Sequence, residues 1–224
     1  MTPQDELLRE LAFGFTFLLI GIKFSLSFFY MRKYFSSEIK NKLILGFALF
    51  FLFLGLGRVF YLIFDFYLTN FNPNLFQTHI IIWKIGSLLS EIGVGILIFI
   101  TEKKVFEGRD KYIFFICYII FVALMVAWPE FERAEDFGSY AVMFGAFILF
   151  SYIYLAVILE GEARKRAVLV VVGLLFYISG SVIVNEYVLK ILVIWGISRF
   201  TMHLISPSLK IIAAIILALG FLTE

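Results

Sequence analysis

LILGFALFFLFLGLGRVFYLIFDFYL, residues 43–68, is the stretch of sequence that decides the fold class. It is apolar almost throughout, and only Arg58 and Asp65 in it carry charge. A helix rises about 1.5 Å per residue, so about 20 residues cross the roughly 30 Å hydrocarbon core of a bilayer. The stretch is therefore long enough to be a transmembrane helix.

Comparable apolar runs recur along the whole chain, separated by short charged segments. Of all 224 residues, 62% are hydrophobic and 16% are charged. The hydrophobic fraction exceeds the apolar content of soluble domains. Mean hydropathy is +0.99. The sequence predicts an all-α integral membrane protein, a single domain over residues 1–224 with a bundle of seven transmembrane helices. We expect these helices at 8–30, 43–68, 79–101, 112–128, 138–159, 167–185 and 202–222.

The segment 186–201 has two possible interpretations. Glu186, Lys190 and Arg199 interrupt an otherwise apolar run that contains Trp195. The segment either extends the sixth helix or lies as an interfacial helix on the outer surface.

Basic residues indicate how the chain is oriented, because short cytoplasmic loops carry an excess of Lys and Arg. Segment 69–78 has no such residue, and 129–138 has only Arg133. We therefore expect the N-terminus outside and the C-terminus in the cytoplasm, in a plasma or cytoplasmic membrane. The basic clusters, which are also candidate sites for protein partners, are Arg32, Lys33, Lys40 and Lys42, then Lys103, Lys104, Arg109 and Lys111, and finally Arg164, Lys165 and Arg166.

Four charges within the second and third predicted helices form a pattern: Arg58, Asp65, Lys84 and Glu91. Each helix carries its two charges seven residues apart, hence on one face. In an antiparallel hairpin, one register brings Arg58 beside Glu91 and Asp65 beside Lys84. Charges inside a bilayer are costly, so we expect these residues to form an intramembrane ladder of salt bridges.

The same two faces carry Tyr61 and Ser87, and the third helix offers the small residues Gly86, Ser90 and Gly93 for close approach. Two interpretations of the ladder stay open. It either fixes how the two helices pack, or acts as a proton or ion relay in which Glu91 changes its protonation state.

Two further lysines lie in predicted helices. Lys23 is expected to extend toward the cytoplasmic headgroups. Lys210 follows Pro207, which would free a backbone carbonyl where a helix lines a cavity. We expect Lys210 to face the protein interior. The predicted ligand or ion site comprises Lys210, Glu91, Arg58, Tyr61, Ser87 and Ser206.

Ser206-Pro207-Ser208-Leu209-Lys210 superficially resembles the retinal-lysine segment of microbial rhodopsins, which also have seven helices. Ser206 stands where those proteins usually carry an aspartate. The expected counterion region offers Lys84 and no acid before Glu91. Retinal on Lys210 is therefore not expected, and no cofactor is predicted.

Other function classes find little support. A net charge of +2 without a basic stretch interleaved with aromatics gives no case for nucleic-acid binding. Two histidines and the single Cys117 make a poor metal site, and no catalytic motif is present. We therefore expect a membrane protein without enzymatic activity, a transporter or channel for a small solute or ion. The alternatives are a sensor or receptor that signals to a separate partner, and a structural subunit of a membrane complex.

Overall fold

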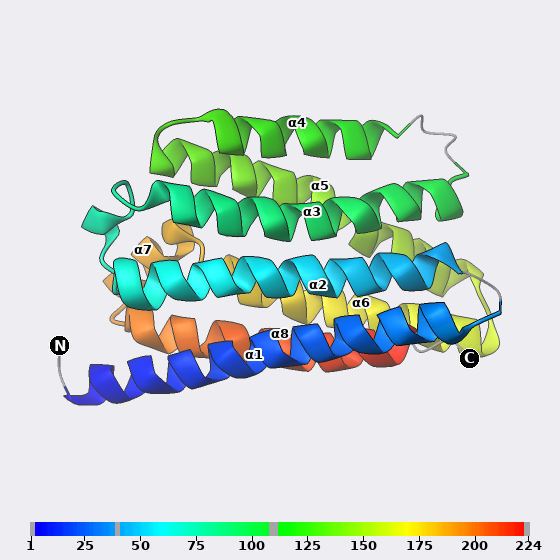
Figure 1. Cartoon of the computed structure of the whole chain (residues 1–224), viewed down its shortest axis with the longest axis horizontal. Coiled ribbons are helices and arrows are strands. Elements are labelled where there is room, and N and C mark those ends of the chain that lie inside the picture. The colour runs from blue at the N-terminus through cyan, green and yellow to red at the C-terminus, as the bar shows by residue number, and fades with distance from the viewer. Residues whose placement is uncertain (1–2, 39–40, 108–111, 222–224) are drawn as a thin grey trace. The chain divides into compact units, whose positions relative to one another are not determined.

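The computed structural model describes residues 3–38, 41–107 and 112–221, which are helical almost throughout (Figure 1). The elements are α1 (Pro3–Ser36), α2 (Lys42–Leu62), the π-helical turn η1 (Ile63–Leu68), the 3-10 turn η2 (Pro73–Leu75), α3 (Ile80–Val105), α4 (Ile113–Ala127), α5 (Phe131–Ile158), α6 (Gly161–Val182), α7 (Glu186–Ile194) and α8 (Arg199–Phe221).

Each predicted helix has a counterpart in the structure. Six helices are long and apolar enough to cross a membrane: α1, α2 with η1, α3, α5, α6 and α8. The seventh, α4, has 15 residues and is shorter than these six. The chain is thus a helical integral membrane protein, whereas the seven-span count and the orientation stay predictions. Of the basic residues used to orient it, Lys40, Arg109 and Lys111 lie outside the described residues.

Several helix starts are set by asparagine. The side chains of Asn41, Asn72 and Asn185 each accept a hydrogen bond from the backbone N–H two residues further on, at 3.0–3.1 Å. Such caps satisfy one of the N–H groups that a helix start leaves without a partner. Asn185 caps the start of α7, so residues 186–194 of the uncertain segment form a short helix separate from α6, while residues 199–201 already belong to α8.

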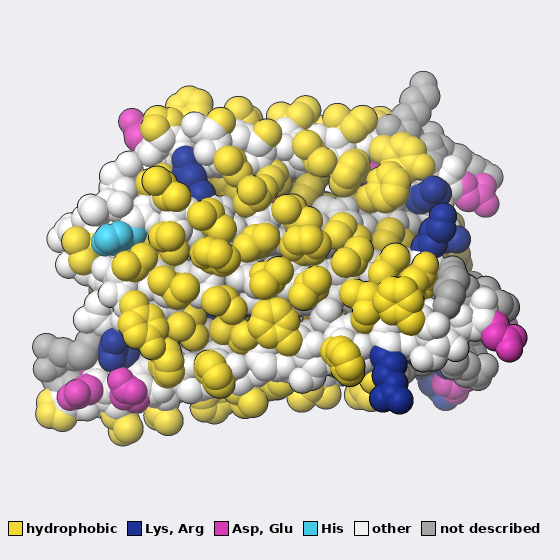
Figure 2. Space-filling model, viewed as in Figure 1, with side chains coloured by type: hydrophobic (Ala, Val, Ile, Leu, Met, Phe, Trp, Pro, Cys, Tyr) yellow, Lys and Arg dark blue, Asp and Glu magenta, His cyan; other side chains and the backbone are white. Residues whose placement is uncertain are grey.

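The chain divides into two compact units, Lys23–Ser151 and the pair of segments Met1–Ile22 and Tyr152–Glu224. In the first unit, α3 lies between α2 and α4 (Figure 1). Figure 2 shows hydrophobic side chains covering the middle of these helices, with Lys, Arg, Asp and Glu mostly near their ends. The single domain predicted from the sequence stays a prediction.

Helices α2 and α3 pack with their backbones in close approach, as the small residues predicted. A Cβ added to Gly57 would lie 2.6 Å from the carbonyl oxygen of Gly86 and 2.2 Å from the hydroxyl of Ser90. Gly93 likewise lies against the backbone of Phe50. The expected antiparallel hairpin with small residues at its seam is confirmed.

Lys23 and Ser27 fasten the second half of α1 to α2. The ammonium of Lys23 is buried and donates to the carbonyl of Leu54 at 3.3 Å, and the hydroxyl of Ser27 donates to that of Ala48 at 2.8 Å. The expectation that Lys23 reaches the headgroups is therefore wrong. A neighbouring helix offers its ammonium a backbone acceptor within the protein.

The other unit is built around the contact between α6 and α8. The hydroxyl of Ser206 donates to the carbonyl of Gly180 at 2.6 Å, which ties the two helices together. The guanidinium of Arg199, at the start of α8, makes a two-pronged ion pair with Glu186 at the start of α7. This pair holds α7 beside the beginning of α8.

Candidate functional site

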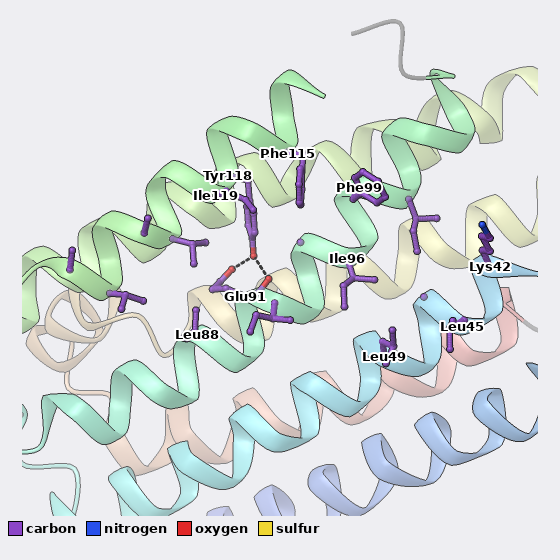
Figure 3. Close-up of a pocket in the computed structure, with 18 of the residues that line it drawn as sticks. Lys42, Leu45, Leu49, Leu88, Glu91, Ile96, Phe99, Phe115, Tyr118 and Ile119 are labelled. Atoms are coloured by element: carbon purple, nitrogen blue, oxygen red, sulfur yellow. Dashed lines mark hydrogen bonds between the residues drawn. The ribbon is translucent and has the colours of Figure 1, made fainter. Parts of the chain in front are cut away.

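A groove of about 860 Å³ runs along α3 in the unit Lys23–Ser151, with α2 and α4 as its walls (Figure 3). Its α3 lining extends from Leu88 to Ile100, a length of about 18 Å at the helical rise per residue. Aliphatic side chains dominate the lining, among them Leu45 and Leu49 of α2 and Ile119 of α4. The groove can therefore hold an elongated apolar molecule.

The polar centre of the groove is the pair of Glu91 and Tyr118 (Figure 3). The Tyr118 hydroxyl hydrogen-bonds to the backbone carbonyl of Glu91 at 2.7 Å and also to its carboxyl oxygen Oε2. A phenol has only one proton to donate. If the carboxyl of Glu91 is protonated, it can donate that proton to the phenol oxygen, and the phenol proton is then left for the backbone carbonyl.

Gly95 makes room for this pair. A Cβ on Gly95 would lie 3.1 Å from the ring of Tyr118, so the ring rests directly on the α3 backbone one turn beyond Glu91. This close approach brings the buried Tyr118 hydroxyl within reach of the carboxyl. The glycine is thus part of the geometry that positions the acid.

Helix α3 also holds both ends of α4. At its start, the fully buried carboxylate of Glu102 accepts hydrogen bonds from the backbone N–H groups of Phe114 at 2.9 Å and Phe115 at 3.2 Å. At its end, the ammonium of Lys84 donates to the carbonyl of Val126 at 2.9 Å and to that of Trp128. An anion at the start of a helix and a cation at its end both interact favourably with the helix dipole. They also pair with the first N–H groups and the last carbonyls, which have no hydrogen-bond partner within the helix.

Two members of the charge ladder predicted between α2 and α3 have hydrogen-bond partners on or just after α4. Glu91 bonds to Tyr118, and Lys84 bonds to the end of α4. The spacing rule considered only the α2–α3 hairpin, but α3 has α4 as a second neighbour, which offers a phenol and free carbonyls. The seam between α2 and α3 is bridged by the predicted residues Tyr61 and Ser87, whose hydroxyls lie 2.6 Å apart.

The remaining charges of the ladder lie on the α2 side. Arg58 is buried, with its guanidinium carbon 6.0 Å from the ring centre of Tyr61. Asp65 is half-buried in η1. The predicted site residues Lys210 and Ser206 belong to the other unit. Lys210 is buried, as expected, with its ammonium 5.7 Å from the ring centre of Tyr177.

Two residues that shape the groove were not singled out from the sequence. Tyr118 is one of several aromatics in an apolar run, so spacing gave no reason to select it. Glu102 lies next to Lys103 and Lys104, where an acid is ordinarily a solvated partner of its neighbours. Only the position of α4 distinguishes these two residues from the others around them.

No protein-family model, curated protein or solved structure matches the chain. The functional assignment therefore depends on the residues of the site.

Proposed function

We propose that the chain is a membrane transporter for an elongated lipophilic molecule, bound in the groove between α2, α3 and α4. The observation that carries the proposal is the groove itself. Its volume of about 860 Å³ is that of a small-molecule site, and it combines a mainly apolar lining with a few polar groups, of which the pair of Glu91 and Tyr118 lies at its centre. Apolar walls supply affinity, while a few placed polar groups supply orientation. The proposal includes no catalytic step and no cofactor, and it places the chain in a plasma or cytoplasmic membrane.

The binding step can be tested by photolabelling. The purified chain in lipid nanodiscs is exposed to a neutral long-chain probe that carries a diazirine, with and without excess unlabelled probe. We expect saturable labelling of α4 around Ile119 and Ala123, which line the groove. Labelling that excess unlabelled probe does not reduce, as at any lipid-facing surface, would contradict a binding site.

A matched pair of variants makes this test specific. Ala123→Trp places a large ring in the groove and should abolish the saturable labelling. Met143→Trp adds a ring on α5, where Met143 is 71% exposed and does not line the groove, and should leave the labelling unchanged. Equal labelling of the two variants would place the probe elsewhere.

A receptor that binds the same class of ligand is the second candidate, and one contact favours it. Glu102 holds the start of α4, a wall of the groove, and lies next to the basic residues Lys103 and Lys104. A ligand that displaces α4 would change a basic segment where a partner protein could bind. Reconstituted vesicles separate the two candidates: a transporter moves the groove ligand across the bilayer, whereas a receptor binds it with the same sensitivity to Ala123→Trp and no flux.

A further inference from the structure

Glu91 is the only acid and Lys42 the only base in the described lining of the groove, and they lie far apart along it. Gly46, one turn beyond Lys42, packs against Ile100 of α3, nine residues from Glu91. Nine residues of helix span about 14 Å, so Lys42 and Glu91 lie about 14 Å or more apart along the groove. The middle of the groove therefore has acidic character, undisturbed by the lysine at its end.

The surroundings of Glu91 suit a neutral carboxyl while the groove holds no charged molecule. An ionised carboxylate among aliphatic side chains would lose its hydration without a compensating cation. With its proton in place, the carboxyl can donate to the oxygen of Tyr118, whose own proton goes to the backbone carbonyl of Glu91. One proton then serves each of the two contacts.

The same region also suits a bulky organic cation. Phe99, Phe115 and Tyr118 line the groove, and the rings of Phe99 and Phe115 lie with their centres 5.3 Å apart. Aromatic faces attract cations that carry little hydration, and the aliphatic walls accept their apolar substituents. The carboxylate of Glu91, which lies beside Tyr118, would supply the matching charge.

We propose that the groove exchanges one proton for one monovalent lipophilic cation at Glu91, a proposal that rests on the groove being the ligand site. When the cation enters, the O–H bond of the carboxyl breaks, the electron pair stays on the oxygen, and the proton passes to water. The carboxylate then pairs with the cation, so the site is neutral before and after the exchange. A transporter with this site would couple cation movement to a proton gradient.

The titratable neighbours of Glu91 are compatible with this exchange. From α4 it faces Tyr118, with Cys117 next in the sequence. From α2, Tyr61 lies within electrostatic range of Glu91, Arg58 and Asp65, and its hydroxyl lies 2.6 Å from that of Ser87. Helix α5 approaches α3 through Gly145, packed against Val94, and its Tyr140 contacts Phe121 of α4. Among these described groups, Glu91 is the acid that lines the groove.

The test uses the purified full chain in nanodiscs, with tetraphenylphosphonium as the cation and triphenylphosphine oxide as a neutral probe. Calorimetry in buffers of different ionisation enthalpy counts the protons released. We expect one proton to be released per bound cation. The cation Kd should fall by up to about tenfold for each unit of increase in pH, over the pH range in which the empty site still carries its proton. Binding of the neutral probe should release no proton and should not depend on pH.

Two variants identify the proton donor. Glu91→Gln should weaken cation binding by about tenfold or more at high pH and abolish proton release, while neutral-probe binding stays within about twofold. Tyr118→Phe keeps the carboxyl and should still release one proton. The neutral probe also confirms that each variant is folded.

Two results would overturn different parts of the proposal. Cation binding without proton release, or equal cation binding by Glu91→Gln, would overturn the exchange and leave the groove as a neutral-ligand site. Failure of the wild-type chain to bind either probe, or binding that survives Ala123→Trp, would overturn the groove assignment itself.

Discussion

Glu102 shows how much one buried side chain contributes to the walls of the groove. Its carboxylate is fully buried and satisfies two backbone N–H groups at the start of α4. We predict that Glu102→Ala lowers the free energy of unfolding by about 1.5–3 kcal/mol, because hydrogen bonds to charged groups are worth about that much. Glu102→Gln, which keeps an acceptor oxygen, should cost less. A denaturation titration in mixed detergent micelles measures both, with the exposed Glu130→Ala as control, and an equal effect of Glu102→Ala and Glu130→Ala would contradict the role given to Glu102.

A second prediction at the residue scale concerns the partner of Glu91. Glu91→Gln and Tyr118→Phe remove two groups in direct contact, so their effects on unfolding should be coupled by about 0.5–3 kcal/mol. Glu91→Gln and Arg58→Met should be additive within about 0.5 kcal/mol, because Glu91 bonds to α4 rather than to Arg58. Double-mutant cycles in the same titration measure both pairs. Strong coupling to Arg58 with none to Tyr118 would restore the predicted ladder.

At the scale of the element, the close contact of α2 and α3 depends on Gly57. A methyl group there would lie 2.6 Å from the carbonyl oxygen of Gly86, a backbone atom, so the two helices would have to separate. We predict that Gly57→Ala destabilises the chain by about 1–3 kcal/mol, the usual cost of overpacking, despite alanine's better helix propensity. Gly21→Ala is the matched control, because nothing lies within 4 Å of its added Cβ, and it should be neutral or stabilising. Unfolding titrations compare the two, and a Gly57→Ala variant as stable as Gly21→Ala would show that the seam tolerates a wider spacing.

The helices and the α2–α3 seam could be predicted from the sequence because each follows from a local rule. Apolar run length is set by bilayer thickness, and small residues mark where backbones meet. The partners of Lys84 and Glu91 could not be predicted, since they depend on α4, a third helix whose face toward α3 has no periodic signal. The sequence also could not decide whether α7 is separate from α6. Its cap, Asn185, is a single polar residue, and its effect depends on where α6 ends.

At the scale of the whole molecule, one side chain bears on the number of membrane crossings. The amide of Gln77, in the connection between α2 and α3, donates to the carbonyl of Pro129 at 3.0 Å and accepts from the N–H of Phe131 at 2.7 Å. The segment after α4 therefore lies at the same end of its unit as the α2–α3 connection. Helix α4 is short, but it runs beside α3 from Glu102 to Lys84, and this supports a full return across the unit.

The last prediction concerns the membrane topology, and it follows from the contact of Gln77 with Pro129 and Phe131 and from the basic loops. Single cysteines are introduced into a Cys117→Ser background at Asn72, Glu132, Lys104 and Lys165, and labelled with a maleimide that cannot cross membranes; a cysteine at position 40 extends the series beyond the described residues. We expect Asn72 and Glu132 to react from outside intact cells, because Gln77 holds their segments at one end. Lys104 and Lys165 should react only after the membrane is opened, because Lys- and Arg-rich short loops stay in the cytoplasm. Lysed cells, in which all sites react, control for accessibility. If Glu132 instead reacts together with Lys104, α4 does not cross the bilayer, and the seven-helix topology is wrong although each helix is present.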